Sequence, residues 1–213
     1  MPLARLLSLL APPLCLACGG AAQVHQPLCR GCRAGLRWLP PEQPPGVGVP
    51  AWAAVSYEGP ARALVRALKF RGAVPLADAM AAQMAANAPP RLFEGRSLVP
   101  VPMHPARRRR RGFNQAKEIA AALARRSGLP LADCLERPAT AGRGSQVGLG
   151  REERLGALNG RVRFRAGAPV PLRALLVDDV VTTGATLTAC AAALATAGVR
   201  EVTAIAYART PGR

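Results

Sequence analysis

LLVDDVVTTGATL, residues 175–187, joins an apolar segment to a helix start through two adjacent acids and a threonine-rich loop. The apolar residues at 175–177 predict a buried strand, and a helix is expected to begin at Gly184. In open α/β sheets, ligands bind beyond the carboxyl ends of the strands, and Asp178 and Asp179 would emerge there. The segment therefore predicts a ligand site at the edge of an α/β sheet.

The residue types in this segment suit a sugar that carries a phosphate. Carboxylates accept hydrogen bonds from a vicinal diol such as the ribose hydroxyls, and they also attract a magnesium ion. The following loop offers backbone N–H groups beside a helix N-terminus. We expect the phosphate to be held by Val181, Thr182, Thr183, Gly184, Ala185 and Thr186. The plainer alternative is that Asp179 caps a turn and that Thr-Thr-Gly is an ordinary strand-to-helix loop.

The rest of the chain after residue 50 alternates strand and helix patterns, which is typical of a parallel sheet with crossover helices. We expect strands at 51–57, 97–101, 172–177 and 199–207, and helices at 60–70, 75–87, 113–126 and 184–197. Residues 138–150 lack an apolar period and suggest a mobile loop, and residues 151–158 suggest a short helix. Walker A, GxGxxG and HExxH patterns are absent from the sequence, which excludes P-loop NTPases, typical dinucleotide enzymes and zincins.

A run of five arginines, residues 107–111, follows the strand expected at 97–101. We expect it to form a basic loop at the same sheet edge as the acids. Arginine matches phosphate oxygens bidentately, and Arg111, with Gly112 and Asn114, is the candidate contact for a pyrophosphate. The earlier arginines are either a solvated face or a nucleic-acid contact. His104 is either a general acid or base or, as we favour, a residue that shapes the loop through a hydrogen bond.

Four cysteines near the N-terminus form two CxxC pairs separated by ten residues: Cys15, Cys18, Cys29 and Cys32. Two such turns complete a tetrahedral thiolate site for zinc, which would be structural because four ligands leave no open position. Redox pairs or two disulfides are the alternatives, and a reducing cytosol disfavours both. We expect a zinc ribbon at residues 1–37, a proline-rich linker at 38–50 and the α/β domain at 51–213.

The composition points to a basic globular protein. The chain has 213 residues, a mass of 22.2 kDa and a net charge of +17. Such a positive charge makes polyanions candidate partners. The alternative is that the arginines reflect an arginine-rich proteome in which arginine has replaced lysine. Aromatic residues make up 4%, which weakens base stacking as a binding mode. Pro12 and Pro13 interrupt the most apolar stretch, so no membrane insertion is expected. The N-terminus is similar to a short signal peptide, but its cleavage would remove Cys15 from the first CxxC pair. We therefore expect that the protein is not exported and is cytoplasmic.

The CxxC pairs, YEGPARALVRALKFRG at 57–72, LVPVPMHPARRRRRGFNQA at 98–116 and VDDVVTTGATLTAC at 177–190 together resemble the ComF family. These are competence-related proteins similar to type I phosphoribosyltransferases, and the match covers nearly the whole chain. Residues 140–150 depart from the pattern because they are expanded and glycine-rich.

The resemblance implies a type I phosphoribosyltransferase fold that binds phosphoribosyl pyrophosphate (PRPP). It implies that Asp178 and Asp179 serve catalysis by holding the ribose hydroxyls, that residues 181–186 hold the 5-phosphate, and that Mg²⁺ chelates the pyrophosphate. A nitrogenous acceptor, which the sequence does not identify, would then attack C1 of the ribose. The family's link to competence implies a role in DNA uptake, with single-stranded DNA and a helicase as partners. A non-catalytic DNA-binding adaptor that retains the fold is the alternative.

Overall fold

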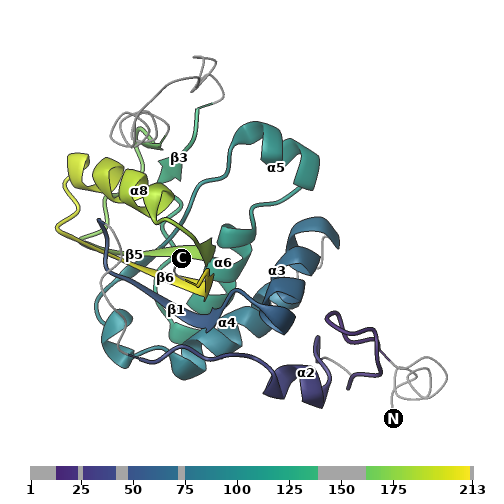
Figure 1. Ribbon diagram of the computed structural model, residues 1–213. Helices are drawn as coiled ribbons and strands as arrows, with labels where there is room; N and C mark the ends of the chain where they lie inside the picture. Colours follow the sequence, from purple (N-terminus) through teal and green to yellow (C-terminus); the bar gives the residue numbers. More distant parts are fainter. Residues whose placement is uncertain (1–12, 24–25, 42–47, 72–74, 139–161, 212–213) are drawn as a thin grey trace, which may run out of the picture.

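The computed structural model describes residues 13–23, 26–41, 48–71, 75–138 and 162–211. At its centre lies a sheet of four parallel strands in the spatial order β1-β6-β5-β2 (Figure 1). The strands are β1 (Ala51–Ser56), β2 (Ser97–Pro100), β5 (Arg173–Val181) and β6 (Glu201–Arg209). They are apolar on both faces, as a parallel sheet covered on both sides requires.

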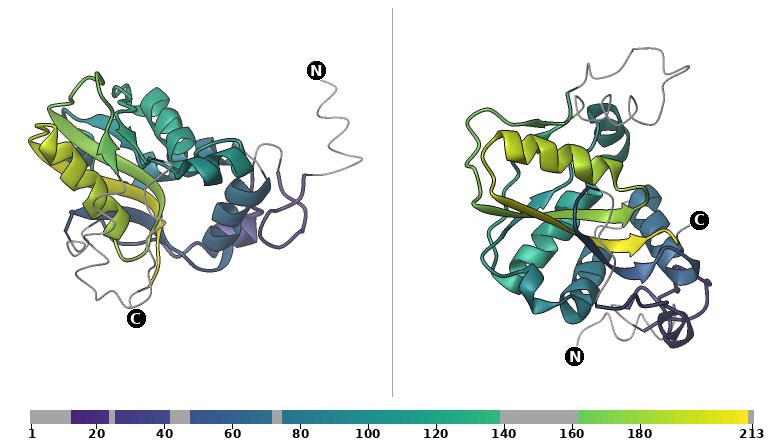
Figure 2. Two further views of the ribbon diagram at one scale, coloured as in Figure 1. Left: turned by 90° about the horizontal axis from the view of Figure 1, so that it is seen from above. Right: turned by 60° about the vertical axis from the view of Figure 1, so that its left-hand side comes forward.

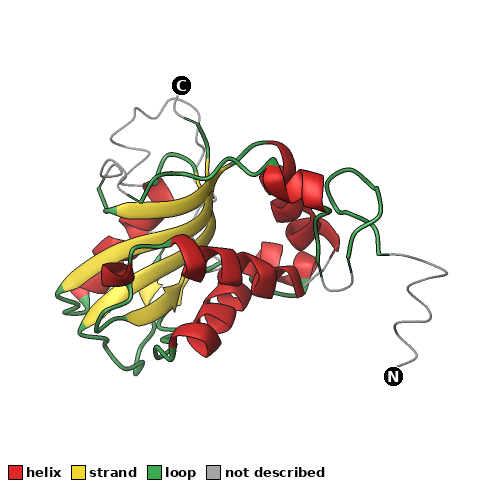
Figure 3. Ribbon diagram, turned by 90° about the horizontal axis from the view of Figure 1, so that it is seen from below, coloured by secondary structure: helices red, strands yellow, loops and turns green. Residues whose placement is uncertain are grey.

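Helices cover both faces of the sheet (Figure 3). One face carries α3 (Gly59–Arg71), α4 (Pro75–Asn87) and α6 (Gln115–Ser127), and the other carries α8 (Ala185–Thr196). Alternate residues of β5 serve the two cores: Leu175 and Val177 pack toward the first group of helices, and Ala174 and Leu176 toward α8. The expected parallel sheet with flanking helices is confirmed.

The strands that form the centre of the sheet extend further than expected. Both β5 and β6 run past the positions where their apolar patterns end, to Val181 and Arg209. The cause is mutual pairing, because Asp178 lies opposite Ala206 and Val180 lies opposite Ala208. Asp178 and Asp179 therefore lie within strand β5, and its pairing with β6 holds the backbone that carries them.

The arginine run is a helix, and the expectation of a loop was wrong. This helix, α5 (Pro105–Arg111), begins with Nδ1 of His104 accepting a hydrogen bond from the Ala106 N–H at 3.2 Å. Proline suits the first helical position, and Gly112 ends the helix in the left-handed conformation at φ 85°. His104 thus shapes this segment as a helix cap, in line with the reading that we favoured.

The path of the chain creates a crevice between β2 and β5. After α6, Leu131 pairs in parallel with Leu98, on the outer side of β2. The chain therefore steps outward from β2, whereas β5 connects through α8 to β6 in the opposite direction. Ligands of open α/β sheets bind where the direction of winding reverses in this way. The carboxyl ends of β2 and β5 mark that point here.

The remaining described elements are short. They are α2 (Arg30–Ala34), the 3-10 turn η1 (Pro90–Leu92), and the antiparallel pair β3 (Leu135–Glu136) and β4 (Arg163–Phe164). In the part of the chain that the structure describes, no helix combines the length and the apolar character needed to cross a membrane.

The N-terminal segment packs on the α/β core near α3, and Figure 2 shows the two side by side. Cys15, Leu28 and Leu36 are buried in the same cluster as Leu64 of α3. Trp38 pairs antiparallel with Val55, so the start of the expected linker covers the edge of β1. The division at residues 38–50 stays a prediction. Residues 1–12, 24–25, 42–47 and 139–161, which include the signal-like stretch and most of the glycine-rich loop, lie outside the described residues.

Candidate functional site

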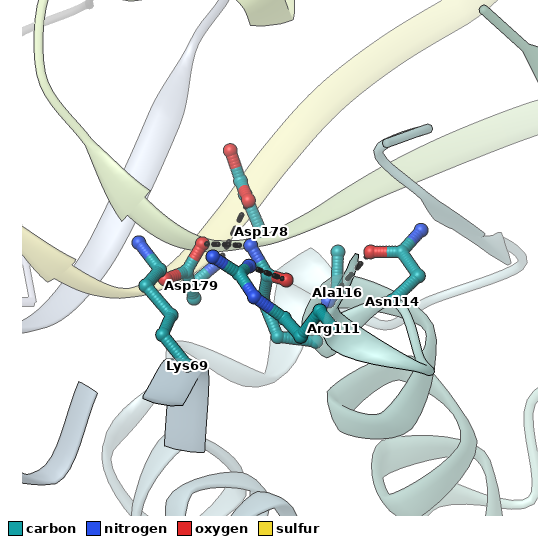
Figure 4. Close-up of polar contacts among 7 residues, drawn as sticks. Lys69, Arg111, Asn114, Ala116, Asp178 and Asp179 are labelled. Carbon is teal, nitrogen blue, oxygen red and sulfur yellow. Dashed lines mark hydrogen bonds and ion pairs between the residues drawn. The ribbon is translucent and has the colours of Figure 1, made fainter. Parts of the chain in front are cut away.

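The two acids of residues 178–179 lie at the carboxyl end of β5, beside the crevice (Figure 4). Consecutive strand residues point to opposite sides, and the two differ accordingly in exposure. Asp178 is half-buried and Asp179 is 3% exposed. Oδ1 of Asp178 accepts a hydrogen bond from the backbone N–H of Asp179 at 2.8 Å.

Asp179 is the centre of a polar network that joins four elements. Lys69 at the end of α3 places its Nζ 2.5 Å from Oδ2 of Asp179. Gln115 at the start of α6 donates from Nε2 to Oδ1 of Asp179 at 3.3 Å, and its Oε1 accepts from Arg111 of α5 at 2.5 Å. Figure 4 shows Lys69 and Arg111 converging on the acid pair. A buried carboxylate requires such partners, because an unpaired one would carry a large desolvation cost.

Burial, and then the charge of Asp179, raises the pKa of Asp178 well above its ordinary value. The ionised pair is therefore unfavourable in the isolated protein, since two neighbouring carboxylates repel each other in a weakly solvated site. Hydrogen-bond donors or a cation placed at Asp178 would relieve that cost. The arrangement suits a ligand that brings hydroxyl groups or a divalent ion to this edge of the sheet.

The loop after β5 turns sharply into α8. Gly184 holds φ 77° at the N-cap, where a left-handed backbone favours glycine, and the Ala185 N–H is 3.4 Å from Oγ1 of Thr183. Thr182 and Thr183 are exposed. The first turn of a helix leaves N–H groups without partners inside the helix, so this exposed turn is able to accept an anion.

A cavity of about 180 Å³ lies beside the acids. Its lining includes five residues of the sequence-predicted site: Asp178, Asp179, Arg111, Asn114 and Thr186. The cavity walls do not include Val181, Thr182, Thr183, Gly184 or Ala185. The structure thus brings the acids together with Arg111, and it leaves most of the threonine loop next to the cavity rather than in its lining.

Three lining residues were missed by the sequence reasoning as site residues: Lys69, Gln115 and Arg137. Lys69 falls within the helix expected at 60–70, whose pattern did not mark it as a site residue. One available signal was that it is one of two lysines in a chain whose other basic side chains, apart from histidine, are arginines. Gln115 directly follows the Gly-Phe-Asn segment that was singled out. Nothing in the sequence pattern identifies Arg137.

Arg111 is the least exposed member of the arginine run. Its guanidinium lies 5.8 Å from the ring centroid of Phe70, and burial lowers its pKa. Phe70 itself is 70% exposed. The other four arginines of α5 are exposed, and none forms an ion pair with a described residue. The helix therefore presents concentrated positive charge to solvent beside the cavity.

The four N-terminal cysteines form a second candidate site, a metal centre. Their Sγ atoms all lie within 4.8 Å of one another, and Sγ of Cys18 is 3.8 Å from Sγ of Cys29. Tetrahedral zinc with Zn–S distances near ~2.3 Å needs sulfur–sulfur separations of about 3.8 Å. The donor set and the spacing both fit zinc. Burial acts to raise the pKa of the Cys15 thiol, but hydrogen bonds from backbone N–H groups outweigh it and lower this pKa to about 6.

The two remaining cysteines, Cys134 and Cys190, are both buried. Burial is also the main cause that raises the pKa of each thiol. Neither belongs to a metal-type cluster among the described residues. They pack as small apolar side chains in the core under α8.

One curated protein is similar to this chain in sequence. No family model matches the chain. A competence protein, ComFC of Streptococcus pneumoniae, is 29% identical over 166 residues, which are 77% of this chain and 70% of the relative. The chain is thus similar in sequence to a ComF competence protein over most of its length. The resemblance drawn from the cysteine pairs and the Asp-Asp segment is confirmed.

Among solved structures, orotate phosphoribosyltransferase from Aeropyrum pernix matches with a TM-score of 0.38 and 19% identity. The match covers 72% of this chain and 66% of the transferase, just under two thirds of its length.

Proposed function

We propose that the protein binds PRPP at the crevice between β2 and β5 and transfers its phosphoribosyl group, assisted by Mg²⁺, to a nitrogenous acceptor. The observation that supports this most is the placement of Asp178 and Asp179. They lie at the point where the winding of the sheet reverses, beside a cavity that also contains Arg111 and Lys69. Carboxylates for a diol and cations for phosphates are thereby combined at one sheet edge.

Each end of the donor has suitable partners in this geometry. The half-buried carboxyl group of Asp178 can accept hydrogen bonds from ribose hydroxyls. The exposed turn at residues 182–184, with the N-terminus of α8, suits the 5-phosphate. Lys69 and Arg111 supply positive charge for the pyrophosphate. The protein would act by positioning and charge rather than through a nucleophile of its own.

Magnesium fits the same oxygen-rich edge, because carboxylate and phosphate oxygens are the ligands it prefers. Asp178 and Asp179 are the residues that would hold or face it, and the ion would supply neutralisation of the pyrophosphate charge. In the proposed transfer, the lone pair of the acceptor nitrogen forms the C1–N bond. The C1–O bond breaks, its electron pair leaves with pyrophosphate, and the proton of the attacking nitrogen passes to solvent.

The cysteine centre is proposed to hold structural zinc. Four thiolates complete the tetrahedron, so no position remains for a substrate. The cysteine segment is small, and its buried residues Cys15, Leu28 and Leu36 belong to a core shared with α3. Zinc would stabilise a segment that has too few apolar residues to fold alone.

A role in competence and DNA uptake, with the protein in the cytoplasm, is proposed from the relationship to ComFC. One observation favours a second candidate, an adaptor that binds single-stranded DNA and docks on a helicase. The four exposed arginines belong to the same helix as Arg111, whose guanidinium lies 5.8 Å from the centroid of the exposed Phe70 ring. Arginine charge combined with an exposed ring is typical of single-strand binding surfaces. If no pyrophosphate is released from PRPP with any acceptor tested, this second function is favoured.

A thermal-shift measurement tests the donor site first. Ribose 5-phosphate and PRPP are each added with and without Mg²⁺ to the wild type, to Asp178→Asn and to Asp179→Asn. Binding to the folded state raises the unfolding midpoint, and we expect the rise in the wild type and its loss in both variants. Glu94→Gln, an exposed turn residue at the opposite end of β2, is the matched control. No shift in the wild type with either compound would contradict the proposal.

A further inference from the structure

The side chain of Gln115 lies between a cation and an acid of the proposed donor site. Its Oε1 accepts a hydrogen bond from the Arg111 guanidinium at 2.5 Å, and its Nε2 donates to Oδ1 of Asp179 at 3.3 Å. Among the described residues, Arg111 forms no direct ion pair with an acid. Burial lowers the pKa of Arg111 and the charge of Asp179 opposes that effect, so the two charges act on each other although they do not touch.

The chemistry of its two neighbours fixes the direction of the Gln115 amide. A guanidinium only donates hydrogen bonds and an ionised carboxylate only accepts them, so the amide oxygen must face Arg111 and the amide nitrogen must face Asp179. Asp179 is held from its other side, since Nζ of Lys69 lies 2.5 Å from its Oδ2. The acid is therefore a fixed anchor to which Gln115 ties the arginine.

The backbone that carries Gln115 is fixed as well, because this residue opens α6 directly after the helix cap. Oδ1 of Asn114 accepts a hydrogen bond from the Ala116 N–H at 3.1 Å, and its Nδ2 donates to the carbonyl of Val101, just beyond β2, at 3.0 Å. Ala116 itself is buried in the core. The amide of Gln115 thus extends from a rigid position at the carboxyl edge of the sheet.

The helix that carries Arg111, in contrast, has no core packing to hold it. None of the seven residues of α5 is buried, and segments with few buried contacts move most easily. Among the described residues, the Arg111 side chain has two contacts, the hydrogen bond to Gln115 and the Phe70 ring 5.8 Å away. Phe70 is exposed, and cation–π contacts at exposed sites are weak. Gln115 is therefore the stronger of the two restraints on the guanidinium.

We propose that Gln115 is a positioning residue, which holds the Arg111 guanidinium at the cavity beside the acids so that it meets the pyrophosphate of PRPP. The amide takes one of the five N–H donors of the guanidinium and leaves the others for phosphate oxygens. It also keeps the arginine from closing on Asp179, where the two charges would neutralise each other. This inference rests on the proposed function, because it explains how one cation of that donor site is held.

Two ligands separate this role from a general effect on the site. Inorganic pyrophosphate with Mg²⁺, and ribose 5-phosphate, are titrated calorimetrically into the full chain and into Gln115→Met, which keeps the side-chain length and removes both hydrogen bonds. We expect the variant to bind pyrophosphate about tenfold more weakly, the factor that one charge-assisted hydrogen bond contributes. Ribose 5-phosphate should bind as it does to the wild type, because its proposed partners are Asp178 and the turn at 182–184.

A double-mutant cycle shows whether Gln115 acts through Arg111. In an Arg111→Met background, Gln115→Met should have no further effect on pyrophosphate affinity. In an Arg109→Met background it should again cost about tenfold, because Arg109 carries the same charge on α5 and does not line the cavity beside the acids. Phe70→Leu, which removes the weaker restraint, should cost about threefold.

The melting temperature of each variant shows whether it is folded. Gln115→Asn, whose amide is one carbon too short to reach both partners, replaces Gln115→Met if that variant does not fold. If both ligands bind the wild type and the Gln115 variant keeps its full affinity for pyrophosphate, the positioning role is refuted and the donor site stands. Equal loss of both ligands, or the same loss in the Arg111→Met background, reveals a structural effect and also overturns the inference. Binding of neither ligand by the wild type overturns the proposed function and this inference with it.

Discussion

Lys69 Nζ lies 2.5 Å from Oδ2 of Asp179, which joins the end of α3 to the carboxyl end of β5. The lysine side chain is 23% exposed and the aspartate side chain 4%. The ion pair holds a nearly buried carboxylate in position before any ligand binds. It also means that a ligand reaching this acid competes with, or joins, an existing cation.

Removing the lysine should destabilise the protein. Lys69→Met leaves the carboxylate of Asp179 buried with only Gln115 as a partner, and we expect a loss of about 2 kcal/mol in the free energy of unfolding. Urea unfolding measures it. Lys117→Met is the matched control, because its pair with Asp133 is far more exposed and should be worth less than about 1 kcal/mol. Equal losses in the two variants would contradict this role of the pair.

Asp178→Asn should stabilise the protein at neutral pH. The pKa of Asp178 is raised in the folded state, so its favourable contribution is complete below the ordinary pKa of aspartate and is lost as the pH rises through the folded value. The asparagine variant escapes this loss. The gain in melting temperature should be present at pH 8 and should vanish near pH 3.8, the ordinary value, in a melting series across that range. A gain that does not depend on pH would show that the cost has another origin.

Zinc should stabilise the α/β core as well as its own segment. Cys15, Leu28 and Leu36 share a core cluster with α3, so loss of the metal should loosen the helix that carries Lys69. Native mass spectrometry should find one zinc per chain, and Cys18→Ser should lower both the zinc content and the melting temperature. Cys134→Ser is the control for loss of a thiol outside the cluster, and it should keep the zinc. Full zinc content in Cys18→Ser would exclude the four-thiolate centre.

The exposed arginines predict a salt-dependent affinity for nucleic acid. Arg109 and Arg110 do not line the cavity beside the acids. Together they should account for a change of about 1.4 in the slope of log affinity against log salt. Fluorescence anisotropy with a labelled single-stranded oligonucleotide measures the slope in the Arg109→Ala, Arg110→Ala double variant. Arg200→Ala, an exposed residue just before β6, should leave the slope unchanged. An unchanged slope in the double variant would place DNA binding elsewhere.

The sequence predicted the central sheet well because its strands are buried on both faces and read as apolar runs. It underestimated β5 and β6, since pairing between Asp178 and Ala206 extends the strands through polar residues that no apolar pattern marks. It also missed α5, because five consecutive arginines hide a helix that depends on the cap at His104 and on Gly112. Composition alone does not distinguish that helix from a basic loop.

The site was predicted where it follows one short segment and missed where it depends on tertiary contact. Asp178 and Asp179 could be singled out as candidates because a strand, two acids and a glycine loop are contiguous in the sequence. Lys69 and Gln115 come from elements that are distant in the sequence, and only the folding of α3 and α6 against the sheet brings them to Asp179. The cavity beside the acids likewise takes its lining from α3, α5, α6, β5 and α8, so no local pattern contains it.

Calorimetric titration of PRPP with Mg²⁺ into the wild type and into Asp178→Asn tests the central claim most directly. Asparagine keeps the size of the side chain and removes its charge, so any change reports the carboxylate at the sheet edge. The account predicts saturable binding of one PRPP per chain in the wild type and at least about tenfold weaker binding in the variant. No heat of binding in the wild type, or equal affinity in the two proteins, would contradict it.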